Sequence, residues 1–170
     1  MDKYNFNNHL LNNTCRVQDR CEQRRVNCEE HEEDKICNSC ENKCQDEHGG
    51  EVYSANISKI AFANQNFRES VWTGKYLQMT LMSIPCRSEI GVELHSDTDQ
   101  YIRVEHGIAL ALTGNNKDAL CNKYKLNTGE AIFIPAGVWH NIINIGRRSL
   151  KISSVYAPPH HPKCTVEKTK

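Results

Sequence analysis

Three side chains that can bind a metal ion stand out because two chain segments are suited to present them together. His95 and Asp97 are two residues apart in the strand-like run 91–107, so both side chains leave the same face of a sheet. His140 follows a Pro-x-Gly turn within residues 129–144, between two apolar runs. First-row divalent metals bind neutral imidazoles together with carboxylate oxygens. The spacing therefore predicts a site with two nitrogen ligands and one carboxylate.

Other polar side chains near these segments have competing interpretations. Asp99 shares the strand parity of the predicted ligands, but a turn aspartate is the favoured interpretation. Glu93 and Asp99 are weak candidates for a general base. Arg103 could pair with an anionic ligand group or with Glu93, and a structural ion pair explains it equally well. His160 and His161 could cover a pocket, although their Pro-broken surroundings favour a flexible tail.

The elements that must position these residues are short strands. After Gly50 the chain consists of apolar or alternating runs separated by Gly, Pro and Asn turns, which is typical of a β-sandwich or barrel. The predicted strands are residues 53–63, 75–84, 90–95, 101–104, 108–113, 131–134, 141–145 and 150–156. The polar, Pro-containing residues 156–170 are predicted to wrap the outside as an extended tail.

Length and charge limit the possible classes of protein. A chain of 170 residues can bury one sizeable core, so one globular domain with an appendage is expected. Lys plus Arg equals Asp plus Glu, at 21 each, which disfavours a nucleic-acid partner. No apolar run approaches the length of a membrane span, and the N-terminal residues have no signal-peptide pattern. We therefore expect no membrane association and a cytoplasmic location.

The cysteines divide the chain into two regions. Of the nine, six precede residue 50, at Cys15, Cys21, Cys28, Cys37, Cys40 and Cys44. Their spacing follows helical stripes, so a short cysteine-rich, helical appendage is predicted for residues 1–50, followed by the barrel domain at 51–170.

Two chemical interpretations of these cysteines stay open beside a disordered, reduced tail. Cys28, Cys37, Cys40 and Cys44 could hold a zinc ion, since thiolates bind zinc strongly. Alternatively, the six cysteines could form disulfides or cross-link neighbouring chains, which is slightly favoured.

A known family accounts for the second of the two ligand-bearing segments. The pattern G-x5-P-x-G-x2-H-x3-N is the second motif of the cupins, and it is matched at every fixed position by Gly129, Pro135, Gly137, His140 and Asn144. From about residue 52 to 170 the chain thus resembles the cupin superfamily. This resemblance implies an all-β fold, a jelly-roll β-barrel.

The first cupin motif is matched only in part. His95 and Gly107 fit, Asp97 stands where a second His is usual, and Gln100 stands where a Glu is usual. The resemblance thus implies a divalent metal (Fe, Mn, Ni or Zn) on His95 and His140, with Asp97 or Gln100 completing the site. The runs N-F-R, W-T-G and Y-A-P-P look closest to single-domain cupins labelled mannose-6-phosphate-isomerase-like.

Two functions follow as expectations. The first is a metal-binding cupin that holds a small polar ligand, a sugar or a carboxylate, in the barrel mouth. If it is an enzyme, isomerase or epimerase chemistry and dioxygenase chemistry are both open. The second is a non-catalytic structural or redox-sensing protein cross-linked through its N-terminal cysteines. The resemblance implies a homodimer in either case.

Overall fold

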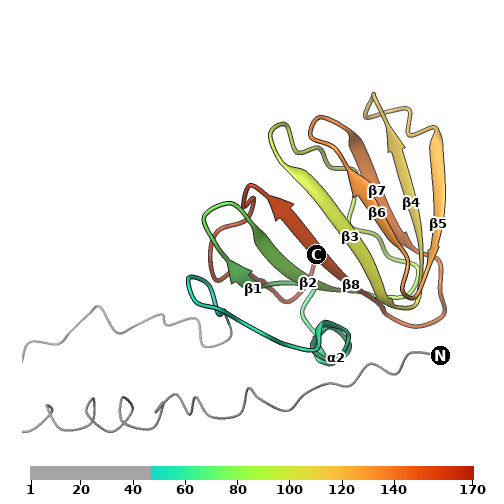
Figure 1. Ribbon diagram of the computed structural model, residues 1–170. Helices are drawn as coiled ribbons and strands as arrows, with labels where there is room; N and C mark the ends of the chain where they lie inside the picture. Colours follow the sequence, from blue (N-terminus) through green and yellow to red (C-terminus); the bar gives the residue numbers. More distant parts are fainter. Residues whose placement is uncertain (1–46) are drawn as a thin grey trace, which may run out of the picture. The chain divides into compact units, whose positions relative to one another are not determined.

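The computed structural model describes residues 47–170, and these form two antiparallel sheets that face each other (Figure 1). The predicted helical stripes and the zinc site at Cys28, Cys37, Cys40 and Cys44 lie outside the described residues, as does nearly all of the predicted appendage. In the part of the chain that the structure describes, no helix is long and apolar enough to cross a membrane.

The larger sheet has six strands in the order β6-β3-β8-β2-β1-β9. The strands are β1 (Arg68–Thr73), β2 (Gln78–Ile84), β3 (Asp99–His106), β6 (Ala131–Ile134), β8 (Leu150–Ala157) and β9 (Val166–Glu167). The smaller sheet has the order β5-β4-β7 and consists of β4 (Ile108–Gly114), β5 (Asn122–Asn127) and β7 (Trp139–Asn144). The predicted all-β barrel is therefore confirmed.

The inner faces of the two sheets are apolar at one end and polar at the other. On β2, Gln78 and Thr80 precede Met82 and Ile84 at alternating positions, and all four are buried. The same change occurs along β3 and β8, and on β7 His140 precedes Ile142. The apolar halves form one core cluster that joins both sheets and includes Met82, Ile84, Ile102, Val104, Ala111, Ile142 and Ile152. The polar halves lie together at the end where β2, β3 and β7 begin and β8 ends.

The predicted first strand, residues 53–63, is wrong, because none of these residues lies in a strand. Residues Ile57–Ala63 form helix α2, because the Asn56 side chain accepts a hydrogen bond from the Lys59 backbone at 2.9 Å and so caps the helix. Ile57, Ile60 and Ala61 follow helical rather than alternating spacing, and they pack in a separate cluster with Val71 and Leu81. Helix α2 thus lies on the outer face of the larger sheet, against β2, β3 and β8.

The predicted strand 90–95 forms single bridges rather than a regular strand. Glu89 pairs with Ile143 and Glu93 pairs with His140. Glu93 and His140 exchange both backbone hydrogen bonds, at 2.9 and 3.0 Å. This segment therefore runs antiparallel beside β7 and brings the two ligand-bearing parts of the sequence into contact.

The C-terminal segment is more ordered than a flexible tail. Gln78, which is fully buried, donates to the carbonyl of His161 at 2.9 Å and accepts from the His161 backbone at 2.9 Å. Beyond it, β9 pairs with β1, and the Arg68 guanidinium binds Glu167 at 3.0 Å. These contacts hold the segment across the polar end of the barrel.

Candidate metal centre

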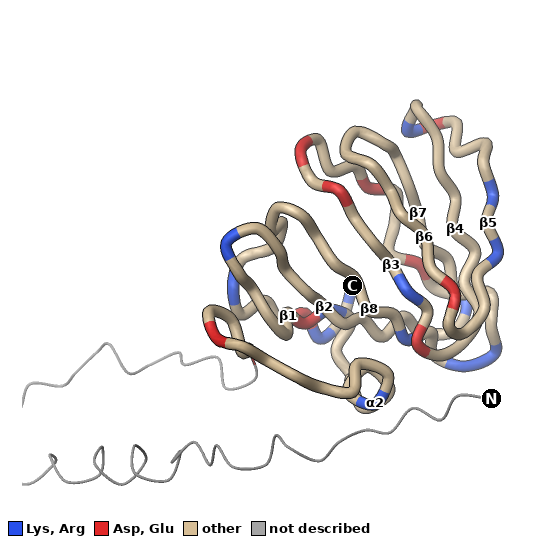
Figure 2. Tube along the Cα trace, viewed as in Figure 1, with Lys and Arg blue, Asp and Glu red and all other residues tan. Residues whose placement is uncertain are grey.

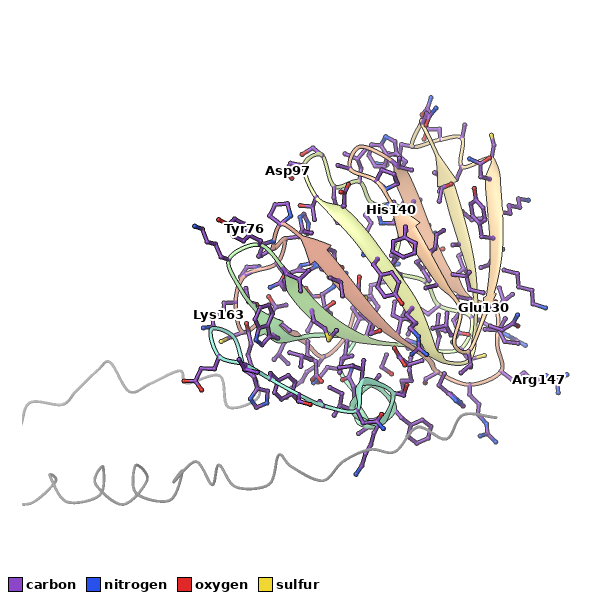
Figure 3. The ribbon with its side chains drawn as sticks, viewed as in Figure 1. Tyr76, Asp97, Glu130, His140, Arg147 and Lys163 are labelled. Atoms are coloured by element: carbon purple, nitrogen blue, oxygen red, sulfur yellow. The ribbon has the colours of Figure 1, made fainter. Side chains whose placement is uncertain are left out.

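Three side chains converge at the polar end of the barrel: Glu93, His95 and His140. One ligand atom from each lies within 4.8 Å of the others. Glu93 Oε1 is 3.3 Å from His140 Nε2 and 3.6 Å from His95 Nε2. Figure 3 shows His140 between the two sheets, where it is fully buried. The cluster therefore has the two-nitrogen, one-carboxylate composition that the sequence predicts, with a different carboxylate.

The local backbone explains why these side chains meet. Directly opposed residues of an antiparallel pair project to the same face, so Glu93 and His140 both point into the barrel. His95 is two residues after Glu93 and keeps its parity. The Pro135–Gly137 turn lies beside it, because the Gly137 backbone donates to the carbonyl of His95 at 2.7 Å, and its φ of +78° suits glycine.

The hydrogen bonds of His140 fix which nitrogen faces the cluster. Its Nδ1 lies 2.9 Å from the carbonyl of Val138, which can only accept, so Nδ1 donates. Nε2 of the neutral ring then presents its lone pair to Glu93 Oε1, and neither atom has a hydrogen-bond partner among the described residues. Both ring nitrogens of His95 are also buried and form no hydrogen bond with the described residues. A cation bound by these lone pairs would satisfy them all, and the Val138 bond is the kind that orients a metal-binding histidine.

The carboxylate of Glu93 is charged in this setting. Burial disfavours the charged form, but hydrogen bonds and charge interactions with His140 and His95, which require a proton on the facing ring nitrogens, outweigh burial and lower the pKa of Glu93 well below its usual range. The Arg68 guanidinium adds a further cation, with Nη2 4.0 Å from Glu93 Oε2. A metal ion would take the place of those protons beside the Glu93 carboxylate.

Of the other predicted ligands, Asp97 lies outside the converging group, whereas Gln100 lies on the inner face of the barrel. Asp97 is exposed in a bend before β3 and is not part of the converging group (Figure 3), because the extended backbone ends after His95 and the strand parity is lost. Gln100 is buried on the inner face of β3, where its amide nitrogen donates to Ser154 Oγ at 2.9 Å. Asp99 is the first residue of β3 rather than a turn residue, and its carboxylate accepts from the Ala136 backbone at 2.9 Å.

Glu93 is the member of the converging group that reasoning from the sequence assigned to other roles. Strand parity could have identified Glu93, since it stands two residues before His95 and its side chain therefore leaves the same face of a strand. Arg103, considered as its partner, lies on the outer face and binds Glu105 instead.

The two histidines of the C-terminal segment are also close to the site. The ring centroid of His160 lies 4.0 Å from that of His95, and the ring centroid of His161 lies 4.9 Å from that of Tyr156.

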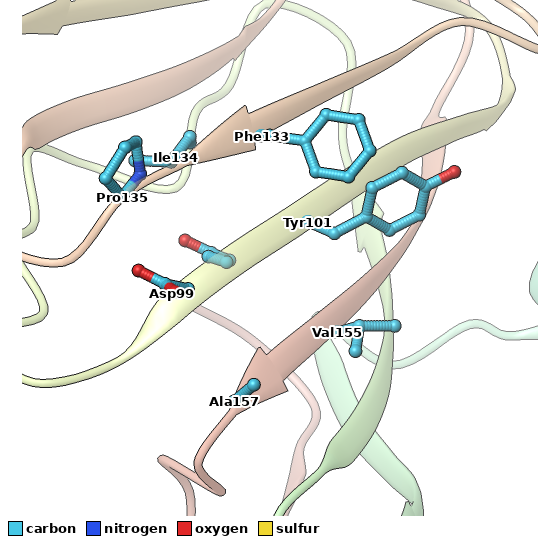
Figure 4. Close-up of a pocket in the computed structure, with 8 residues that line it drawn as sticks. Asp99, Tyr101, Phe133, Ile134, Pro135, Val155 and Ala157 are labelled. Atoms are coloured by element: carbon cyan, nitrogen blue, oxygen red, sulfur yellow. The ribbon is translucent and has the colours of Figure 1, made fainter.

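A hollow lies on the outer face of β3, β6 and β8, the face that points away from the barrel interior, and it contains no member of the converging group (Figure 4). Its lining is mainly apolar, and the ring centroids of Tyr101 and Phe133 lie 4.9 Å apart.

Around the described chain as a whole, acidic and basic residues are interspersed (Figure 2).

Comparisons with known proteins agree with this architecture. Residues 80–156 match the family model described as a cupin domain. The protein YrkC of Bacillus subtilis (strain 168), named as uncharacterized, is 42% identical over 124 residues, which cover 73% of this chain and 67% of YrkC. The uncharacterized protein L612 of Acanthamoeba polyphaga mimivirus is 42% identical over 118 residues, covering 69% of this chain and 72% of that protein.

A solved structure extends the likeness to three dimensions. The crystal structure of BH2720 from Bacillus halodurans superposes with a TM-score of 0.71 at 45% sequence identity, covering 72% of this chain and 93% of that one. Sequence identity, the matched domain and the shared barrel agree, and the chain belongs to the cupin superfamily.

Proposed function

We propose that this protein binds a first-row divalent metal ion through Glu93, His95 and His140 and uses the ion to hold a small polar ligand inside the barrel. The observation that carries the proposal is the set of unpartnered, buried ligand atoms that converge within 4.8 Å. Buried polar atoms are almost always satisfied in native proteins. A cation on three lone pairs would satisfy them together.

The donor set fits the metal class. Two imidazoles and one carboxylate suit Fe, Mn, Co, Ni or Zn, whereas Ca and Mg prefer oxygen ligands. When bound, such an ion supplies Lewis-acid polarisation of a carbonyl or hydroxyl oxygen. The protein's part is to hold the imidazoles, through the Val138 carbonyl for His140, and to present the Glu93 carboxylate beside the Arg68 guanidinium.

Elemental analysis of the full chain, purified without chelator or nickel affinity, tests the proposal. The wild type should hold about one equivalent of metal, His140→Ala should lose it, and His106→Ala should keep it. His106 is a matched control because it lies on β3 against Phe62, away from the converging group. Circular dichroism would establish that each variant is folded, and His140→Gln provides a second, less disruptive change.

Two results would contradict the proposal. One is a wild-type protein without metal after incubation with Zn²⁺, Mn²⁺ or Fe²⁺. The other is metal that persists in His140→Ala and disappears when the N-terminal cysteines are changed to serine. That second pattern would favour the alternative role in which the cysteine-rich segment carries the chemistry.

A further inference from the structure

The polar half of the barrel interior holds more unsatisfied groups than a metal ion would use. We propose that these groups form a subsite for a small carboxylate that also carries a hydroxyl group, bound beside the metal. The proposal rests on the metal-binding function proposed above, since the ion supplies part of the charge. The side chains that make the subsite are Arg68, Thr80, Gln100, Tyr156 and His161, hereafter the inner polar patch.

Burial makes these groups a strong indication of a ligand. Tyr156 and Thr80 are 0% exposed, Gln100 is 3% exposed and Arg68 is 9% exposed. The Tyr156 hydroxyl, Thr80 Oγ1, Gln100 Oε1 and Arg68 Nε form no well-aligned hydrogen bond within residues 47–170. The Tyr156 hydroxyl lies near those of Thr80 and Ser154, which partly offset the burial that raises the pKa of Tyr156. Leaving such a group unsatisfied destabilises the fold. Several such buried polar groups at one end of the barrel predict a polar ligand.

The inner polar patch is contiguous and adjoins the metal ligands. Across the larger sheet, Gln100 on β3 lies opposite Tyr156 on β8, and Tyr156 lies opposite Gln78 on β2. Thr80 is two residues further along β2 on the same face. The Tyr156 ring is 5.6 Å from the His95 ring, between centroids.

The patch also reaches the carboxylate and the C-terminal segment. Arg68 approaches Glu93 from β1, with Nη2 4.0 Å from Oε2. His161 packs its ring edge-on against Tyr156, and its buried Nε2 has no partner among the described residues. Residues from β1, β2, β3, β8 and the C-terminal segment therefore adjoin the three converging ligands.

The charges and donor types select the ligand class. A divalent ion and the Arg68 guanidinium outweigh the carboxylates of Glu93 and Glu167 by one positive charge, which favours a monoanion. Arg68 Nε can only donate, so it requires an acceptor such as a carboxylate oxygen. Gln100 and the hydroxyls of Thr80 and Tyr156 are neutral. A ligand hydroxyl, which both donates and accepts, satisfies these groups whichever way the Gln100 amide is turned.

Three compounds of equal carbon number separate these requirements. Glycerate carries a carboxylate and hydroxyls, propionate carries only the carboxylate, and glycerol carries only hydroxyls. Calorimetric titration of each into the metal-loaded full chain should give measurable binding for glycerate and binding at least tenfold weaker for propionate and glycerol. The tenfold difference corresponds to the loss of one to two well-formed hydrogen bonds.

Conservative substitutions assign the binding to the patch. Tyr156→Phe and Thr80→Val remove one hydroxyl each without changing side-chain size. Each should weaken glycerate binding roughly three- to tenfold and leave propionate binding unchanged. Both variants should remain folded and keep their bound metal. Tyr101→Phe is the matched control, because Tyr101 follows Gln100 but lies on the outer face of the same strand.

The outcomes distinguish this inference from the metal proposal. If the wild type holds metal but binds the three compounds equally, or binds none, the subsite assignment is wrong and the metal centre stands. If glycerate binds and the two variants bind it as well as Tyr101→Phe does, the ligand lies elsewhere and the assignment again fails. If the wild type cannot be loaded with metal, the metal proposal fails and the subsite with it.

Discussion

Glu93 and His140 are paired twice, once through their backbones and once through their side chains. They exchange backbone hydrogen bonds at 2.9 and 3.0 Å, and Glu93 Oε1 lies 3.3 Å from His140 Nε2 inside the barrel. Because Nδ1 of His140 donates to Val138, two acceptors face each other across that distance when the ring is neutral. A shared cation resolves this arrangement, which is why the pair is central to the proposed function.

Metal should stabilise the folded chain. An ion that binds only the native state adds about 2.7 kcal/mol at 100 times its dissociation constant, which raises Tm by roughly 5–10 °C for a chain of this size. We expect Zn²⁺ or Mn²⁺ added to chelator-treated protein to give such a shift in scanning calorimetry, and Ca²⁺, which prefers oxygen ligands, to give none. The shift should vanish in His95→Ala. An equal shift in that variant would argue against the site.

Gln78 should hold the C-terminal segment over the barrel. Gln78→Leu keeps the side-chain size but removes the hydrogen bonds to the His161 backbone, so the segment should detach more often. Trypsin cleavage after the exposed Lys163 should become several-fold faster, and the free energy of unfolding should fall by about 1–3 kcal/mol. Gln65→Leu, at an exposed glutamine, should change neither quantity. Unchanged cleavage in Gln78→Leu would mean that β9 alone holds the segment.

Glu105 should make stability depend on pH on the acidic side. Burial opposes its charge, but hydrogen bonds from Ser153, Ser58 and Arg103 outweigh burial and lower its pKa below the ordinary value of 4.5. A group with a lowered folded-state pKa stabilises the protein above its unfolded pKa, and this contribution is lost as the pH falls through the folded pKa.

Urea unfolding measured from pH 7 down to pH 3 would detect this effect. Glu105→Gln should be less stable than wild type at pH 7, by about 1–3 kcal/mol, and should lose less stability on acidification. Glu51→Gln, at an exposed carboxylate, serves as the control. Parallel curves for wild type and Glu105→Gln would refute the assignment.

Asn144, the last residue of the second cupin motif, should act on stability rather than on metal binding. Its side-chain nitrogen donates to the carbonyls of Ile84, Pro85 and Arg148 at 2.8–3.0 Å, and its oxygen accepts from Gly146. Asn144→Ala should lower the free energy of unfolding by about 2–3 kcal/mol while metal content stays at the wild-type level. Loss of metal from a folded Asn144→Ala protein would contradict this. Asn122→Ala, on the exposed edge strand, is the control.

Much of the barrel could be predicted because its strands alternate clearly. The run 131–134 coincides with β6, and the predicted ends of β4, β7 and β8 differ from the observed ends by one or two residues. β5 was missed because N-K-Y-K-L-N is a polar, exposed edge strand that lacks an apolar face. Helix α2 was missed because its apolar residues also fit a strand, and only the Asn56 cap and packing against β2 decide the conformation.

The metal centre could be predicted in part. His140 was identifiable because its position after the Pro-x-Gly turn is fixed locally, and His95 followed from the partial first motif. The carboxylate could not be chosen from sequence, because Glu93 and Asp97 flank His95 at equal spacing. The choice depends on where the extended backbone bends, at residues 96–97, and on the bridge to β7. The position of His160 and His161 depends on Gln78, which is some 80 residues distant in sequence.

The most direct measurement is therefore a Co²⁺ titration monitored by the visible absorption of the bound ion. It compares two chelator-treated variants, each of which lacks one of the two carboxylates that flank His95. Glu93→Gln should weaken Co²⁺ binding at least tenfold and alter the spectrum, because a charged ligand is lost. Asp97→Asn should bind Co²⁺ with the affinity and spectrum of wild type. Weakened binding in Asp97→Asn together with wild-type binding in Glu93→Gln would contradict the assignment of the metal centre to Glu93, His95 and His140.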